Sequence, residues 1–125
     1  MAAQTKTILL VDDDQFARGG ITEMLRGMGY EVIEASTGPE ALAASDRHAG
    51  GIDLLITDLI MPGMTGRMLA DALTAKRPGL PVVFISGYVE GDRQEDLGPG
   101  VLYLQKPVTW DSLKQKVREA MKKKA

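Results

Sequence analysis

Short runs of apolar residues alternate with longer amphipathic stretches along this chain of 125 residues. The apolar runs are rich in β-branched side chains and cover residues 7–11, 30–35, 53–58, 82–86 and 101–104. Runs of this length and composition are typical of strands that are buried on both faces of a parallel sheet. The pattern therefore predicts five strands separated by helical segments.

The stretch after the first run has its apolar residues at helical spacing (i, i+3, i+4 and i+7), namely Ile21, Met24, Leu25 and Met28. Gly29 is expected to end this helix, because glycine adopts the left-handed conformation that terminates helices. The pair Gly19-Gly20 should weaken its first half, by roughly 1 kcal/mol per glycine relative to alanine.

Three further helices are expected. The second begins at Gly38-Pro39, because a proline at the first helical position lacks only an N–H that would be unpaired anyway. The third follows the loop 61–66, and the last has Thr109 or Asp111 as its N-cap. The residues expected to face inward from these helices are Ala41, Leu42 and Ala44, then Leu69, Ala72 and Leu73, and finally Leu113, Val117, Ala120 and Met121.

The segment between the fourth and fifth runs breaks the pattern. Alternation calls for a helix there, but residues 90–100 hold one large apolar residue, Leu97, together with three glycines and Pro99. A helix without an apolar stripe has little to hold it against a sheet. We therefore expect a short or mobile fourth helix.

Five strands alternating with helices predict a right-handed α/β sandwich around a parallel sheet. The length fits one domain, residues 1–125. No G-x-G-x-x-G or P-loop pattern follows the first strand, which argues against a dinucleotide site and against a glycine cradle for phosphates.

Composition narrows the function classes. The absence of cysteine excludes disulfides and thiolate zinc sites, and the net charge of −2 with a pI near 5.4 argues against nucleic-acid binding. No apolar run reaches the length of a membrane span, and no signal peptide is recognisable, so we expect a cytoplasmic protein with no membrane contact. Lys122-Lys123-Lys124 is interpreted as favourable charge at a helix C-terminus, with a docking tail for an acidic partner as the alternative.

Acidic residues follow two of the predicted strands directly. Asp12, Asp13 and Asp14 come after the first run, and Asp58 ends the third. Ligands of open α/β sheets bind outside the carboxyl ends of the strands, where neighbouring carboxylates would repel one another. A hard divalent cation such as Mg²⁺ would relieve that repulsion. Alternatively, residues 12–14 form a helix N-cap run.

Two further strand ends carry polar side chains, Ser86 after the fourth run and Lys106 after the fifth. Each alone could be an ordinary turn or loop residue. Together with the acids they resemble the receiver domain of two-component response regulators over essentially the whole chain. The segments that carry the resemblance are Leu10-Val11-Asp12-Asp13-Asp14, residues 57–66, Ile85-Ser86-Gly87-Tyr88 and Lys106-Pro107. The resemblance implies a flavodoxin-like (βα)5 fold, doubly wound, with strand order 2-1-3-4-5.

The resemblance also implies roles for the acids. Asp58 would be the phospho-acceptor, whose carboxylate attacks phosphorus to give an aspartyl phosphate. Asp13, Asp58 and the main-chain carbonyl of Ile60 would bind Mg²⁺ directly, and Asp12 would act through a metal-bound water. Asp14 is expected outside the set of direct ligands.

The remaining roles implied by the resemblance concern the phosphoryl group and the response to it. Lys106 would pair with phosphoryl oxygens, and Ser86 would donate a hydrogen bond to one of them. Tyr103 lies where the family has a switching aromatic, with a fixed half-buried tyrosine as the alternative. Tyr88 would shield the phosphate or line a loop. His48, the only histidine, is expected to be a solvated residue away from the site, which leaves no internal phosphodonor.

We therefore expect a phosphorylation-controlled switch that receives its phosphoryl group from a sensor histidine kinase or a histidine phosphotransfer protein. Its output would be binding to a downstream protein target, since no effector segment follows the last helix. It would assist its own phosphorylation and dephosphorylation without acting on another substrate. A stand-alone receiver is favoured over a receiver of a hybrid histidine kinase.

Two rival functions stay open. A Mg²⁺-dependent phosphatase with an aspartyl-phosphate intermediate typically has a second acid two residues after its nucleophile, where this chain has Ile60. A degenerate receiver that serves as a constitutive binding module would be favoured by loss of an acid or of the lysine, and none is lost here.

Overall fold

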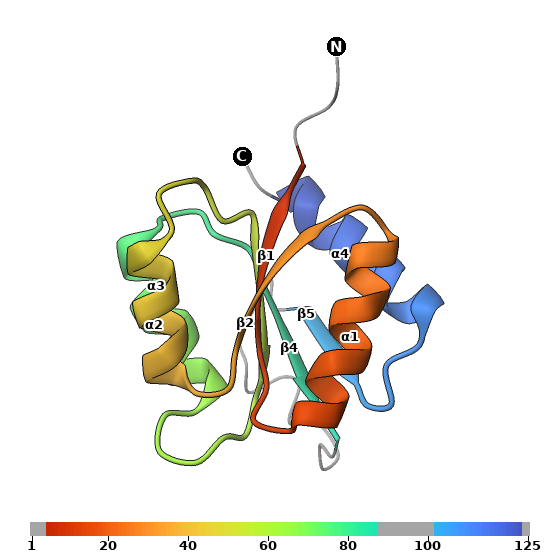
Figure 1. Cartoon of the computed structure of the whole chain (residues 1–125), viewed down its shortest axis with the longest axis horizontal. Helices are drawn as coiled ribbons and strands as arrows, with labels where there is room; N and C mark the ends of the chain where they lie inside the picture. Colours follow the sequence, from red (N-terminus) through yellow and green to blue (C-terminus); the bar gives the residue numbers. More distant parts are fainter. Residues whose placement is uncertain (1–4, 88–101, 124–125) are drawn as a thin grey trace.

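The five predicted strands form one parallel sheet. The computed structural model describes residues 5–87 and 102–123. Its strands are β1 (Thr7–Val11), β2 (Glu31–Ala35), β3 (Leu54–Asp58), β4 (Val82–Ser86) and β5 (Leu102–Gln105). They pair in the order β2-β1-β3-β4-β5, with every neighbouring pair parallel (Figure 1). The predicted fold class and strand order are confirmed.

Within the described residues, four helices cover the sheet, two on each face: α1 (Gln15–Gly27) and α4 (Trp110–Lys123) on one, α2 (Gly38–Arg47) and α3 (Gly66–Lys76) on the other (Figure 1). Alternate residues along a strand pack against the helices on opposite faces of the sheet. Ile8 and Leu10 of β1 pack with α1 and α4, whereas Leu9 and Val11 pack with α2 and α3. Both faces of the strands are therefore buried, which explains why the strands read as continuous apolar runs.

Side-chain caps fix where the helices begin. Asp14 caps α1 by accepting hydrogen bonds from the N–H groups of Phe16 and Ala17, at 3.0 and 3.3 Å. Helix α1 runs without a break through Gly19 and Gly20, so its apolar face and its cap outweigh the cost of the two glycines. It ends as predicted, with Gly29 at a φ of +99°.

The sequence named two candidate caps for α4, and the structure selects Thr109. Its Oγ1 accepts from the N–H of Ser112 at 3.1 Å, while Asp111 lies inside the first turn. The first residue of α4, Trp110, lies against the last residue of α1. A Cβ added at Gly27 would be 3.2 Å from two atoms of the indole ring. Trp110 as a whole residue is 43% exposed.

Two details of side-chain placement differ from the sequence prediction. In α3 Leu69 and Leu73 are buried as predicted, but the buried alanine is Ala70 and Ala72 is only half-buried, because the buried stripe runs through residues 66, 69, 70 and 73. His48 is half-buried and not fully solvated, and its imidazole lies against Gly50, where an added Cβ would be 3.2 Å from Nε2. It lies at the C-terminal end of α2, whereas the N-terminal end of that helix follows β2.

The predicted fourth helix at residues 90–100, Tyr88 and the start of the fifth predicted strand lie outside the described residues. Among the helices that are described, none combines the length and apolar character needed to cross a membrane.

Candidate functional site

Polar side chains from the ends of three strands meet at the carboxyl edge of the sheet. Asp58 is the last residue of β3, Asp12 and Asp13 follow β1, and Lys106 follows β5. One carboxylate oxygen from each of the three aspartates lies within 4.8 Å of the others. The structure thus brings together residues that are up to 94 positions apart in the sequence (106 − 12).

The backbone around Asp58 is held closely on both sides. The N–H of Leu59 donates to the carbonyl of Ile85 at 2.8 Å, and the N–H of Gly66 donates to the carbonyl of Leu59 at 3.0 Å. A Cβ at Gly66 would overlap the Asp58 carbonyl oxygen, so only glycine lets the start of α3 approach this closely. The Asp58 Oδ1 also accepts from the N–H of Ile60 at 3.3 Å. This loop fixes both the main chain and the carboxylate of Asp58.

The acidic loop after β1 is built differently for each of its residues. Asp12 is fully buried, and its Oδ1 accepts from the N–H of Asp14 at 2.9 Å. Asp13 is exposed, whereas Asp14 uses its carboxylate to cap α1. The N-cap alternative for this run is confirmed at Asp14, whereas the carboxylates of Asp12 and Asp13 lie at the acidic site and their part in metal binding stays a prediction.

Lys106 bridges two of the carboxylates. Its Nζ lies 2.9 Å from Asp12 Oδ2 and 3.1 Å from Asp58 Oδ2, and its side chain is 19% exposed. Three carboxylates and one ammonium leave a formal charge of −2 in a small, largely buried space. A divalent cation would neutralise this net negative charge.

Burial and charge shift the protonation equilibria of this cluster. Burial raises the pKa of the Asp58 carboxyl, and the negative charge of Asp12 adds to the effect, while Lys106 and the Ile60 N–H oppose it. Burial alone would lower the pKa of Lys106, but the hydrogen bonds and charges of Asp12 and Asp58 outweigh it, so that this pKa is raised. Lys106 is therefore held as a cation, and the site is short of positive charge.

The donor set fits Mg²⁺. Its three ligand groups are all carboxylates, which are the hard oxygen ligands that this ion prefers, and they converge from two strand ends. Asp12 Oδ2 has less than 1 Å² of accessible surface and faces only the Lys106 ammonium among the described residues, which adds to the demand for positive charge. The predicted contribution of the Ile60 carbonyl stays a prediction.

Comparison with known proteins decides the family. Residues 8–118 match the model of the response regulator receiver domain. The chain belongs to the receiver domain family. It is 38% identical to the chemotaxis protein CheY of Pseudomonas aeruginosa over 90% of this chain and 93% of that one. It is 34% identical to the sensor kinase CckA of Brucella abortus over 94% of this chain.

The solved structures agree with this assignment. The receiver domain of the hybrid histidine kinase CckA matches with a TM-score of 0.79 at 39% identity, over 92% of this chain and 98% of that one. A receiver protein of Sinorhizobium medicae matches with a TM-score of 0.86 at 25% identity, over 99% of this chain and all of that one. The chain spans only 13% of the length of the Brucella CckA and 31% of the length of a cyclic di-GMP phosphodiesterase of Thermotoga maritima.

Ser86 and Tyr103 of this receiver domain are joined through the main chain. The carbonyl of Ser86 accepts from the N–H of Lys106 at 2.8 Å and from the Tyr103 hydroxyl at 3.4 Å. Ser86 is 2% exposed and Tyr103 is half-buried. Burial raises the pKa of Tyr103, with a smaller contribution from the charge of Asp58, so the phenol stays a neutral donor. The end of β4 is thus linked to both Lys106 and the aromatic ring, and the switching role of Tyr103 stays a prediction.

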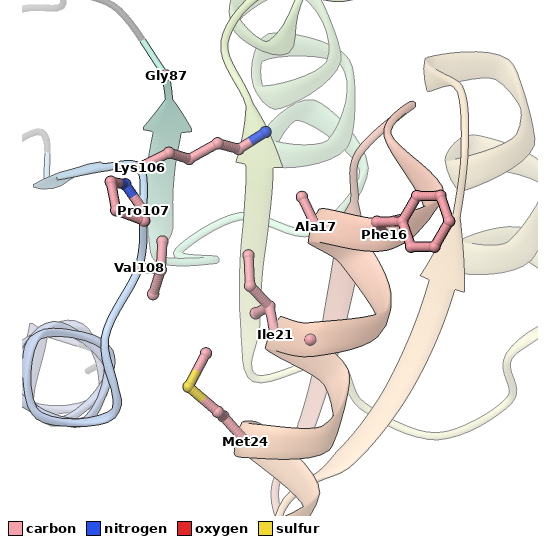
Figure 2. Close-up of a pocket in the computed structure, with 9 residues that line it drawn as sticks. Phe16, Ala17, Ile21, Met24, Gly87, Lys106, Pro107 and Val108 are labelled. Carbon is pink, nitrogen blue, oxygen red and sulfur yellow. The ribbon is translucent and has the colours of Figure 1, made fainter.

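An apolar groove of about 510 Å³ lies beside the acidic site (Figure 2). One wall is α1 and the other is the connection between β5 and α4; the lining includes Phe16, Ile21, Met24, Pro107 and Val108. Lys106 also lines the groove, and in Figure 2 its side chain extends from the β5–α4 connection toward the end of β3. The groove and the acidic site are therefore continuous.

Sequence reasoning missed two residues that shape the site. Gly66 was visible only as part of a loop motif, and the close approach that requires glycine appears only in the fold. Arg18 was not recognised, although its position one helical turn after the cap Asp14 was a usable signal. Its guanidinium donates to the Asp12 carbonyl at 2.6 Å.

Proposed function

We propose that this receiver domain is a phosphorylation-controlled switch that accepts a phosphoryl group on Asp58. An Asp58 carboxylate oxygen attacks phosphorus, the bond from phosphorus to the donor's histidine nitrogen breaks, and that nitrogen keeps the electron pair. The observation that supports this most directly is the placement of Asp58. Its carboxylate ends a buried strand, contacts the Lys106 ammonium at 3.1 Å and shares an edge with two further acids.

The other residues of the site would stabilise the transferred group. Lys106 releases its contact with Asp58 and pairs with phosphoryl oxygens, while the Ser86 hydroxyl donates to another. Asp13, Asp58 and the Ile60 carbonyl would hold Mg²⁺, with Asp12 acting through a bound water. The ion supplies positive charge against the phosphoryl oxygens.

The switch would follow from the added charge. Phosphorylation brings about −1.5 to −2 charges to Asp58 at neutral pH. A Ser86 side chain drawn toward these oxygens would move the strand end whose carbonyl contacts both Lys106 and Tyr103. The equilibrium between two arrangements of the β4–β5 face would then shift, and a downstream protein would read the difference.

The phosphodonor is a sensor histidine kinase or a histidine phosphotransfer protein, which must bring its histidine next to Asp58. The groove beside Lys106 offers such a partner an apolar contact, and Phe16 at its rim is 93% exposed. The same chemistry serves a separate receiver, as in the match to CheY, or a receiver within a kinase, as in the match to CckA.

The test is phosphorylation by acetyl phosphate with and without Mg²⁺, followed by intact mass. We expect one adduct of a single phosphoryl group that requires Mg²⁺ and is absent from Asp58→Asn. Asp46→Asn, which changes an aspartate in an exposed pair with Lys76, is the matched control and should be labelled like the unmodified chain.

Two results would count against the proposal. Unchanged labelling of Asp58→Asn would place the acceptor elsewhere. Turnover of an unrelated phosphoester such as p-nitrophenyl phosphate, lost in Asp58→Asn, would favour the phosphatase.

A further inference from the structure

Arg18 connects three elements at the edge of the acidic site. It lies in α1, one turn after the cap residue Asp14. Its Nη1 donates to the main-chain carbonyl of Asp12 at 2.6 Å, and its Nε donates to Glu34 Oε1 of β2 at 3.0 Å. Its side chain is only 16% exposed, and that of Glu34 is 35% exposed. These contacts therefore hold the guanidinium in place.

The carbonyl that Arg18 holds belongs to the peptide bond between Asp12 and Asp13. The N–H of Asp12 is held as well, because it donates to the carbonyl of Ala35 in β2 at 3.2 Å. The main chain of Asp12 is thus fixed at both ends. Asp13 is exposed, so the direction of its carboxylate depends mainly on the peptide that precedes it.

We propose that Arg18 and Glu34 are a positioning pair for the metal site. Glu34 orients the guanidinium, the guanidinium fixes the Asp12–Asp13 peptide, and the fixed peptide keeps the Asp13 carboxylate directed at the ion. Arg18 touches neither phosphate nor metal. The inference rests on the proposed function, because it concerns the Mg²⁺ that the aspartates would bind.

Charge and position make opposite predictions for loss of Arg18. If its positive charge were what mattered, Arg18→Gln would make the acidic cluster more negative and metal would bind more tightly. If positioning matters, the freed peptide lets Asp13 sample other directions, and metal binds more weakly. The sign of the change therefore separates the two explanations.

The experiment measures Mn²⁺ affinity by electron paramagnetic resonance, with Mg²⁺ as the competitor, because carboxylate sites that suit Mg²⁺ also accept Mn²⁺. We expect Arg18→Gln and Glu34→Gln each to weaken binding of both ions by about 3- to 10-fold. Arg18→Lys should bind the ions almost as weakly as Arg18→Gln does, because an ammonium keeps the charge but lacks the planar fork of donors that holds two acceptors at once. Arg26→Gln removes the same charge from the exposed last turn of α1 and should bind like the unmodified chain.

A double-mutant cycle tests whether the two residues act as one unit. The change in affinity for Arg18→Gln with Glu34→Gln should be smaller than the sum of the two single changes. At saturating Mg²⁺, acetyl phosphate should label each variant as fully as the unmodified chain, because the ion restores the ligand geometry it selects. Labelling would then differ only at low Mg²⁺.

Unchanged or tighter metal binding in Arg18→Gln would overturn the positioning role, even where Asp58 is labelled normally. If the unmodified chain itself binds no metal or accepts no phosphoryl group, the proposed function fails first. Glu34→Gln guards against a misfolded Arg18 variant, because it leaves the arginine in place. Weaker binding in that variant supports the pair only where it exceeds the change in Glu31→Gln, which removes the same charge from the exposed start of β2, and unchanged binding contradicts the pair.

Discussion

Replacing Lys106 by methionine tests how much of the stability of this fold depends on one ammonium. Methionine keeps most of the apolar length of the side chain and removes its charge. The ammonium lies 2.9 Å from Asp12 Oδ2 and 3.1 Å from Asp58 Oδ2, so its loss leaves two buried carboxylates without a protein counter-charge. The metal-free protein should be destabilised.

The size of the effect follows from the geometry. Two carboxylate oxygens no more than 4.8 Å apart repel by at least about 3 kcal/mol at an effective dielectric constant of about 20. Removing one partner of a buried ion pair costs about 3 to 5 kcal/mol. The side chains of Asp58 and Lys106 keep 10% and 19% of their exposure, so we expect the lower end, about 3 kcal/mol.

Urea unfolding at pH 7 in the presence of EDTA measures the loss. Lys76→Met is the matched control, because Lys76 forms a similar contact with Asp46 at 3.1 Å, with both side chains at least half exposed. Its removal should cost no more than about 1 kcal/mol. Saturating Mg²⁺ should recover more stability in Lys106→Met than in the unmodified chain, because the ion replaces the missing positive charge.

The pH dependence has a definite sign. The raised pKa of Asp58 means that this carboxyl takes up a proton at a higher pH than an ordinary aspartate. As the pH falls from 7 toward 4, the unpaired charge in Lys106→Met disappears and its deficit relative to the unmodified chain should shrink. Equal losses in Lys106→Met and Lys76→Met at pH 7, or a deficit that grows on acidification, would refute the reasoning.

Three further predictions concern single residues of the site. Asp58→Asn should raise the free energy of unfolding at pH 7 without metal. The raised folded-state pKa of Asp58 means that its protonated carboxyl contributes stability at low pH and that this contribution is lost as the pH rises, whereas asparagine stays neutral. The gain, measured by chemical denaturation, should therefore vanish below about pH 4. Gly66→Ala should destabilise the fold by about 1 to 3 kcal/mol and slow acetyl phosphate labelling, since its Cβ meets the Asp58 carbonyl, whereas Gly19→Ala, with open space around it, should stabilise α1; equal effects would contradict the packing argument. Asp13→Asn should lose most of the Mg²⁺-induced rise in melting temperature, which reflects about 2.7 kcal/mol at a Mg²⁺ concentration 100 times the Kd; an undiminished rise would remove Asp13 from the metal site.

Most of the fold was predictable because its signals are local. Each strand is an apolar run with a polar residue at its carboxyl end, and a parallel sheet brings those ends to one edge. The grouping of Asp12, Asp58 and Lys106 therefore follows from the order of the elements. The strand order itself came from the family resemblance, since periodicity carries no information about which strands are neighbours.

What could not be predicted depends on contacts between elements. The burial of Ala70 and not Ala72 depends on the rotation of α3 about its own axis, because both alanines lie beside Leu69 and Leu73 on the helix surface. The need for glycine at position 66 depends on how closely that helix approaches β3, and the reach of Arg18 depends on the distance from α1 to Glu34. None of these distances is encoded in a single stretch of sequence.

The contact between Trp110 and Gly27 gives this protein an optical probe of the junction between α1 and α4. Trp110 is the only tryptophan, its ring is partly exposed against the last residue of α1, and it follows Lys106 by four positions. The fluorescence of Trp110 therefore reports on the junction of α1 and α4 without any attached dye. Spectral change during labelling of Asp58 would trace the rearrangement into the α1–α4 layer in real time, and constant emission would confine it to the opposite layer or to the sheet edge.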